Sequence, residues 1–298
     1  MDSTAESKEY RMDWLATLRG VAAFLVFISH LGVLPIDSNF SFIIGRSGVT
    51  CFFLMTGYLA MTSRSKRNRV QYTINRFIRM YPVYWVLLIC YFFLHLNEVS
   101  VIQLLANMTY FEEFIGIGPM LGASWMMPIL VVFYFSVMIF GVSVFMPKES
   151  EKDKIRRGVL LEIICGVFAI ILSLLRFFTN KPFPTAFFLL IAVGIIGVYI
   201  KLLDDSTERI KTKLGYLIPI LVVFEFLLVV SAAFSYREEW IFYEIAYNLG
   251  ILLFVLYKFL NISKGFINKF FSELGKIGFT FFLGAEIECV KSSSQFHF

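Results

Sequence analysis

Apolar runs long enough to cross a lipid bilayer recur along this chain, and they constrain its fold more than any other feature. A helix needs about 20 such residues to span a hydrocarbon core of about 30 Å. The composition agrees, because 58% of the 298 residues are hydrophobic and 16% are charged, far from a soluble domain. Lipid offers no partners to free backbone groups, and no ten-residue alternating pattern suggests a barrel, so we predict an all-α transmembrane bundle. Nine runs lie at 14–34, 47–62, 81–97, 124–146, 158–178, 185–203, 214–235, 240–260 and 274–290.

The distribution of Lys and Arg predicts the orientation of these helices. The loop 63–79 contains six basic residues and no acidic one: Arg64, Lys66, Arg67, Arg69, Arg76 and Arg79. Short cytoplasmic loops are enriched in basic residues, so this loop and the N-terminus are predicted to be cytoplasmic. The other predicted cytoplasmic loops are 148–157, 204–213 and 258–276, and the predicted outer loops are 35–46, 98–123, 179–184 and 235–239. The net charge of +5 then follows from topology and gives no argument for a nucleic-acid partner.

We predict one integral membrane domain, 1–298, with a motif-bearing core at 14–90 and a polar tail at 284–298. The cysteines lie in or beside apolar runs and lack the paired spacing of a disulfide framework or a zinc site: they are Cys51, Cys90, Cys165 and Cys289. No nucleotide-binding loop or metalloprotease motif is present, and we expect no metal and no tightly bound cofactor. The sequence does not indicate whether the protein is a monomer or an oligomer.

Two polar residues, Arg19 and His30, interrupt the first apolar run. Eleven residues separate them, so on a helix they share one face about 16 Å apart along the axis. An Arg near a helix centre costs about 2.5–3.5 kcal/mol on insertion scales, so Arg19 either anchors at the headgroups or faces protein and water. A neutral imidazole at the depth of His30 can take a proton from a hydroxyl and return it to a leaving group.

Two more patterns have both structural and functional interpretations. Gly48, Thr56 and Gly57 would allow close helix contact in an otherwise bulky run. Arg76 and Arg79 stand three residues apart at a cytoplasmic boundary, where orientation alone explains basic residues. Two guanidinium groups there would also make a phosphate clamp.

Together these residues resemble the acyltransferase-3 family of integral membrane O-acyltransferases, which modify bacterial surface polysaccharides and related glycans. Members carry Arg-Gly and a His eleven positions after the Arg, here Arg19, Gly20 and His30. A G-V-x-x-F-F-x-x-S/T-G-Y/F run follows, here Gly48, Val49, Phe52, Phe53, Thr56, Gly57 and Tyr58. The third motif is R-x-x-R with Pro and Tyr, here Arg76, Arg79, Pro82 and Tyr84. The resemblance is strong over about residues 12–90. Over much of the remaining chain it rests on the hydropathy pattern alone.

The sequence departs from the family pattern at three places. Ala16 stands where the family often has Asp. The middle motif W-S/T-L-x-x-E-x-x-F-Y retains Trp125, Phe133 and Tyr134, but Leu130 replaces its acidic residue. After about residue 283 the sequence turns polar, and the family's tenth helix is not recognisable, so we expect about nine spans and a truncated C-terminus. Glu225, which we interpret as the one acidic residue deep in a later span, is a candidate substitute for the missing acid.

The resemblance implies an O-acetyltransferase in the bacterial cytoplasmic membrane. Acyl-coenzyme A, with acetyl the expected acyl group, would be the donor and a glycan the acceptor, with membrane lipids around the helices. His30 and Arg19 are then the catalytic candidates, and Arg76 and Arg79 the candidates for binding coenzyme A phosphates. The candidate supporting residues are Glu225, Trp125, Tyr84 and Thr56. Two alternatives remain open at this point: a transporter or flippase of a glycan or lipid intermediate, and a catalytically silent relative.

Overall fold

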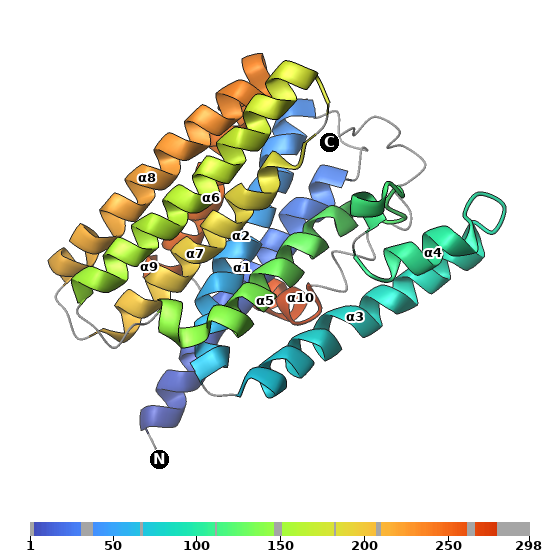
Figure 1. Ribbon diagram of the computed structural model, residues 1–298. Helices are drawn as coiled ribbons and strands as arrows, with labels where there is room; N and C mark the ends of the chain where they lie inside the picture. Colours follow the sequence, from blue (N-terminus) through green and yellow to red (C-terminus); the bar gives the residue numbers. More distant parts are fainter. Residues whose placement is uncertain are drawn as a thin grey trace. The chain divides into compact units, whose positions relative to one another are not determined.

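The computed structural model describes residues 3–30, 38–65, 68–110, 112–145, 151–181, 183–206, 210–260 and 266–278, and these form helices joined by short connections (Figure 1). No strand occurs within these ranges, which confirms the predicted all-α bundle. The helices are α1 Ser3–His30, α2 Ser38–Ser65, α3 Arg69–Leu94, α4 Val101–Asn107, α5 Met126–Phe145, α6 Glu151–Thr179, α7 Thr185–Asp205, α8 Ile210–Tyr236, α9 Trp240–Leu260 and α10 Phe266–Lys276. Three short 3-10 helices join them: η1 Glu112–Ile115, η2 Gly122–Trp125 and η3 Arg237–Glu239.

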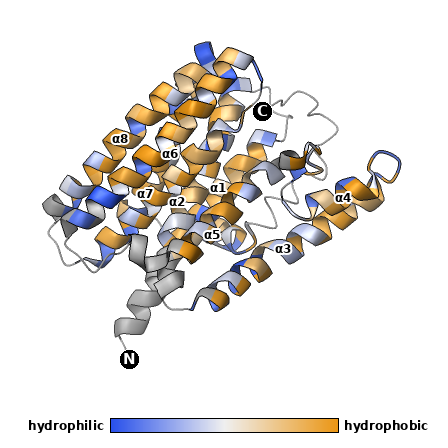
Figure 2. Cartoon of the chain, in the orientation of Figure 1, coloured by the Kyte–Doolittle hydropathy of each residue, from blue (hydrophilic) through white to orange (hydrophobic). Residues whose placement is uncertain are grey.

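Among the described residues, five helical stretches are long and apolar enough to cross a membrane. They are Ser38–Ala60, Val70–Leu94, Arg156–Thr179, Thr185–Asp205 and Lys213–Leu260, and the last contains both α8 and α9. Apolar residues run along α3, α6 and α8, with polar ones gathered toward the helix ends (Figure 2). Many outward-facing side chains are large and apolar, such as Phe93, Phe178 and Phe226, which are 66%, 76% and 67% exposed. The chain is a multi-pass membrane protein, because such surfaces are stable against lipid.

The structure corrects two of the predicted boundaries, and a third lies mostly outside the described residues. The second apolar run was predicted at 47–62, but α2 already begins at Ser38, because polar residues near its start hid the continuing helix. The supposed loop 63–79 is largely the beginning of α3, so Arg76 and Arg79 lie on a helix. The predicted span 274–290 begins where α10 is ending at Lys276, and residues from 279 onward lie outside the described part of the chain.

The described residues fall into two compact units. The first is formed from the ranges Met1–Phe52, Phe77–Pro128 and Ala246–Phe296. In it α1 packs against α10 through two glycines. A Cβ on Gly20 would lie 2.7 Å from the carbonyl carbon of Phe271, and one on Gly275 would lie 2.9 Å from that of Ala16. Backbones approach this closely only where side chains are absent.

The second unit is formed from the ranges Phe53–Arg76 and Ile129–Ile245, and in it α6, α7 and α8 lie side by side (Figure 1). The turns after α6 and after α8 contain Asn180 and Arg237, with φ of 52° and 49°. The Arg237 guanidinium donates to the Asn180 side-chain oxygen at 3.3 Å and lies 5.2 Å from the Phe177 ring centroid. These contacts connect the two turns, so the C-terminal ends of α6 and α8 lie at the same side of the unit.

Candidate active site

His30 is the last residue of α1, and its ring is held by the helix that carries it. Its Nδ1 lies 2.8 Å from the backbone oxygen of Val26 and 3.1 Å from the hydroxyl of Ser29. The Ser29 hydroxyl in turn donates to the Val26 oxygen at 2.6 Å. A carbonyl oxygen can only accept, so Nδ1 carries the hydrogen and donates it. In the neutral imidazole Nε2 then carries the lone pair, which is the arrangement of a general base.

Glycines on α2 hold the turn of α1 that carries His30. A Cβ on Gly45 would lie 2.8 Å from the Cβ of Ser29, and one on Gly48 would lie 2.7 Å from the backbone oxygen of Ala22. The structure therefore supports the packing interpretation of Gly48. It also gives that packing a consequence, because α2 fixes the serine that contacts the His30 ring.

Arg19 lies on the same helix, between Ala16 and Gly20, the two residues whose backbone meets α10. It is partly buried, and a Cβ on Gly278 would lie 3.4 Å from its Cγ. The stem of Arg19 is therefore enclosed by protein of the same unit. Such a contact is compatible with an anchor as well as with a functional side chain, so the catalytic role of Arg19 stays a prediction.

Trp125, a candidate supporting residue, lies beside a buried arginine that the sequence analysis missed. Arg46 is 8% exposed, and its guanidinium carbon lies 4.7 Å from the Trp125 ring centroid and 5.4 Å from that of Phe42. Cations are attracted to aromatic faces at these distances. The sequence placed Arg46 in an outer loop, and only the early start of α2 could have revealed it as an intramembrane charge.

Tyr84 belongs to a buried polar cluster formed by α3 and the segment that follows it. Its ring stacks on that of Tyr110, with 4.2 Å between centroids, and both side chains are fully buried. Glu112 is also buried, and one of its carboxylate oxygens accepts from the Ser124 hydroxyl at 2.9 Å. Burial raises the pKa of Tyr110, and the neighbouring Tyr84 raises it further by a smaller amount. Its hydroxyl therefore stays protonated and donates to the backbone oxygen of Met80 at 3.3 Å.

The two arginines predicted to bind phosphate differ in their surroundings. The guanidinium carbon of Arg76 lies 4.6 Å from the Tyr134 ring centroid and 5.2 Å from that of Tyr72. Arg76 thus packs against a pair of contacting tyrosine rings, whereas Arg79 is exposed on α3. Their role in binding a donor stays a prediction.

With this geometry in place, comparison with known families decides the class of the protein. The family model of the acyltransferase-3 family, described as an acyltransferase domain, matches residues 12–283. The chain belongs to the acyltransferase-3 family. Comparisons with curated proteins and with solved structures return no match. The match extends well beyond 12–90, where the motifs are concentrated, and reaches past α10, so this member is a membrane acyltransferase.

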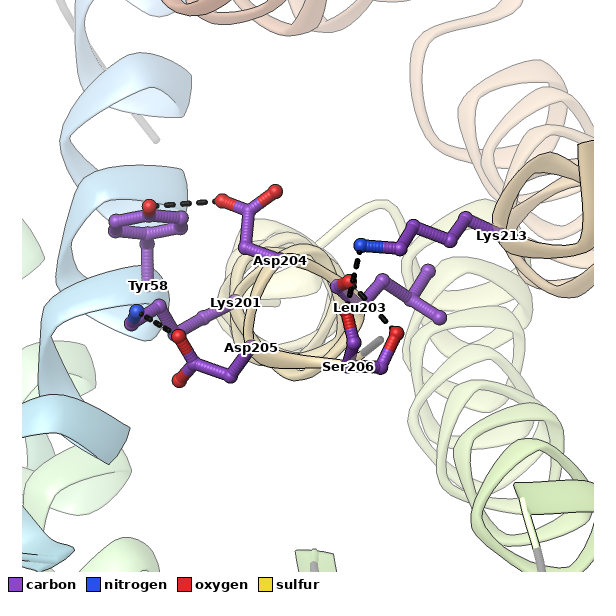
Figure 3. A network of polar contacts seen from close by, with 7 residues as sticks. All are labelled: Tyr58, Lys201, Leu203, Asp204, Asp205, Ser206 and Lys213. Carbon is purple, nitrogen blue, oxygen red and sulfur yellow. Dashed lines mark hydrogen bonds and ion pairs between the residues drawn. The ribbon is translucent and has the colours of Figure 1, made fainter. Parts of the chain in front are cut away.

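Gly57 and Tyr58, which end the second motif of this acyltransferase, have packing and anchoring contacts in the second unit. Gly57 lies against the backbone of Gly194 on α7. The Tyr58 hydroxyl donates to the carboxylate of Asp204 at 2.8 Å, and Lys201 pairs with Asp205 at 2.6 Å. On the far side of α7, Lys213 donates to the backbone oxygen of Ser206 at 2.9 Å, as Figure 3 shows. Thr56, one residue before Gly57, is half-buried.

Glu225 lies near the middle of α8, and its role as a substitute for the missing acid stays a prediction. Glu225 is half-buried on α8, whereas Glu162 on α6 is completely buried. Glu162 lies within the predicted run 158–178, but hydropathy alone does not show which residues of a run are buried in protein. Leu130, at the family's acidic position, is 6% exposed and contributes apolar packing.

Cysteine and metal chemistry contribute little to the described site. The Cys51 thiol donates to the backbone oxygen of Gly250 at 3.0 Å, so it acts as a buried packing residue. Within the described ranges no three His, Cys, Asp or Glu side chains gather as a metal would require. Cys289 and the polar tail lie outside those ranges.

Proposed function

We propose that this acyltransferase moves an acetyl group from acetyl-coenzyme A to a hydroxyl of a cell-surface polysaccharide or another glycan, in the bacterial cytoplasmic membrane. The observation that carries the proposal is the His30 ring. Its Nδ1 contacts Val26 and Ser29, which leaves the lone pair on Nε2. A membrane acyltransferase needs a base of this kind to activate a hydroxyl.

The reaction then follows from the chemistry of a thioester. Nε2 of His30 removes the proton from the acceptor hydroxyl as the oxygen attacks the thioester carbonyl. The tetrahedral intermediate collapses, the carbon–sulfur bond breaks, and the imidazolium returns the proton to the leaving thiolate. The products are an ester and coenzyme A, with no net gain or loss of protons.

Positive charge has two places in this scheme. Arg19, enclosed in the same unit, would stabilise the negative charge that develops on the thioester oxygen or position the donor. Arg76 and Arg79 would contact the phosphates of coenzyme A. Arg79 is exposed on α3, and Arg76, three residues before it, packs against tyrosine rings. Contacts with the two adjoining rings limit the rotation of Arg76, which reduces the entropy lost when it binds an anion.

A catalytically silent relative is the second candidate, and Leu130 is the observation that favours it. An apolar, buried side chain stands where the family has a carboxyl group. If that carboxyl takes part in proton transfer, this member either uses another group or does not turn over. Such a relative would bind acyl-coenzyme A without consuming it.

Transfer of radioactive label from acetyl-coenzyme A to glycan, in membranes with and without this chain, tests the proposal. Label on glycan only when the chain is present supports the acetyltransferase. Binding of acetyl-coenzyme A without transfer or hydrolysis would support the silent relative. Movement of a glycan intermediate across the membrane without binding of acetyl-coenzyme A would contradict both and indicate a transporter.

A further inference from the structure

Glu162 is a carboxyl group enclosed by the second unit, remote in sequence from every motif that the proposed reaction uses. Its side chain is completely buried. Among the described residues, neither of its two carboxyl oxygens has a hydrogen-bond partner. It lies six residues inside the membrane-spanning stretch Arg156–Thr179, about 9 Å along the axis from the beginning of that stretch.

The neighbour of Glu162 on α7 is the hydroxyl end of Tyr199. A Cβ on Gly158 would lie 2.6 Å from the Cζ of Tyr199, the atom that carries its hydroxyl. Gly158 and Glu162 are four residues apart and therefore lie one above the other on the same face of α6. The Tyr199 hydroxyl is buried as well and has no hydrogen-bond partner in the described part of the chain. The charged groups near the Tyr199 hydroxyl are Glu162 and Arg157.

The contribution of α8 around Glu162 is apolar. Leu227 packs on Gly166, one turn after Glu162, and Phe224 and Leu228 beside it are buried. The acidic residue of α8 near this level, Glu225, is half-buried. None of the described side chains of α7 and α8 forms a hydrogen bond with the Glu162 carboxyl group.

Farther along α6, a cluster of buried serine hydroxyls is paired with α8. Ser173 lies eleven residues after Glu162, on the same face of α6. Its hydroxyl donates to the backbone oxygen of Ala169 at 2.8 Å, lies 2.7 Å from the Ser231 hydroxyl and accepts from Ser235 at 2.8 Å. Glu162 and Tyr199 therefore differ from this serine cluster, since buried polar atoms are ordinarily paired.

We propose that Glu162 is an intramembrane proton-binding site, held in the neutral acid form between α6 and α7. An ionised carboxylate buried here, with no hydrogen-bond partner among the described residues, would be strongly unfavourable, and a bound proton removes the charge. The neutral acid also becomes a donor, which the neighbouring Tyr199 hydroxyl can accept after a small rotation. Loss of the proton would place an uncompensated charge between the helices and weaken their packing, so proton binding is linked to the stability of this interface.

Infrared difference spectroscopy between the full-length protein and its Glu162→Gln variant tests the proposal directly. At neutral pH the wild-type protein should show the carbonyl stretch of a protonated carboxylic acid, which shifts in deuterium oxide and is lost in the variant. Carboxylate bands in place of the acid band would overturn the proposal. Because the spectrum reports either form, both results are informative and neither depends on catalysis.

Matched variants separate this site from its surroundings. Glu225→Gln removes a half-buried carboxyl from the same unit and should leave the acid band unchanged. Tyr199→Phe retains the ring and removes the hydroxyl, so it should shift the frequency of the band without abolishing it. The midpoint of thermal unfolding in detergent should fall with rising pH in the wild-type protein, and this fall should be lost in Glu162→Gln. An equal fall in that variant would contradict the linkage.

Discussion

The close approach of α2 and α7 predicts opposite effects for the same substitution at two glycines. A Cβ on Gly57 would lie 2.8 Å from the carbonyl carbon of Gly194 and 3.1 Å from the backbone nitrogen of Val198, and nearer still to the Gly194 oxygen. A Cβ on Gly215 in α8 would meet nothing within 4 Å. Alanine at Gly57 therefore has to displace backbone, whereas alanine at Gly215 enters open space.

The magnitudes follow from helix propensity and from packing. Alanine is favoured over glycine in a helix by about 1 kcal/mol, so Gly215→Ala should be neutral or more stable by up to that amount. Overpacking of a well-packed interface costs about 1–3 kcal/mol. The upper end applies at Gly57, because backbone cannot rotate away as a side chain can. After the propensity gain, Gly57→Ala should lose about 2 kcal/mol of unfolding free energy.

Equilibrium unfolding in mixed micelles, with both variants compared to the wild-type protein, measures the difference. We expect the unfolding free energy of Gly215→Ala to exceed that of Gly57→Ala by about 3 kcal/mol. This is the sum of the propensity gain at Gly215 and the loss at Gly57. Equal stabilities would refute the reasoning, because they would show that α2 and α7 do not approach closely at Gly57.

Three other predictions concern single contacts. Tyr58→Phe removes the hydrogen bond to Asp204 and should lower the unfolding free energy by about 1 kcal/mol; no change in a micelle unfolding experiment would show that this bond is not formed. Ser173→Ala leaves two buried hydroxyls without their shared partner and should cost about 1–3 kcal/mol in the same assay, and a variant as stable as the wild-type protein would contradict the serine cluster. Arg79→Gln should raise KM for acyl-coenzyme A in initial-rate measurements with a smaller change in kcat, whereas an unchanged KM would exclude Arg79 from donor binding.

The helical architecture was predictable from the sequence because lipid leaves a long apolar segment few alternatives to a helix. The boundary of α2 was less accessible, since Ser38, Asn39 and Ser41 interrupt the apolar pattern although the helix continues through them. Burial was not predictable for a related reason. Apolar residues surround most of these helices, so hydropathy does not reveal which face meets protein and which meets lipid.

The same limit of hydropathy explains which residues of the candidate site could be predicted from the sequence. His30 and Arg19 could be selected because they are polar residues within the first apolar run, and Gly48 and Gly57 because small residues are distinctive among Phe and Leu. Arg46 and Glu162 needed three-dimensional information. Only the packing around them shows that Arg46 contacts Trp125 and that Glu162 is fully enclosed.

The central claim is that His30 acts as the base in acyl transfer, and comparison of transfer rates for His30→Ala and the wild-type protein tests it most directly. Both proteins should be inserted in membranes at equal levels, with binding of acetyl-coenzyme A measured alongside. The account predicts that binding is retained while transfer of label to glycan falls by about 10²- to 10⁴-fold. Transfer at the wild-type rate in His30→Ala would contradict it.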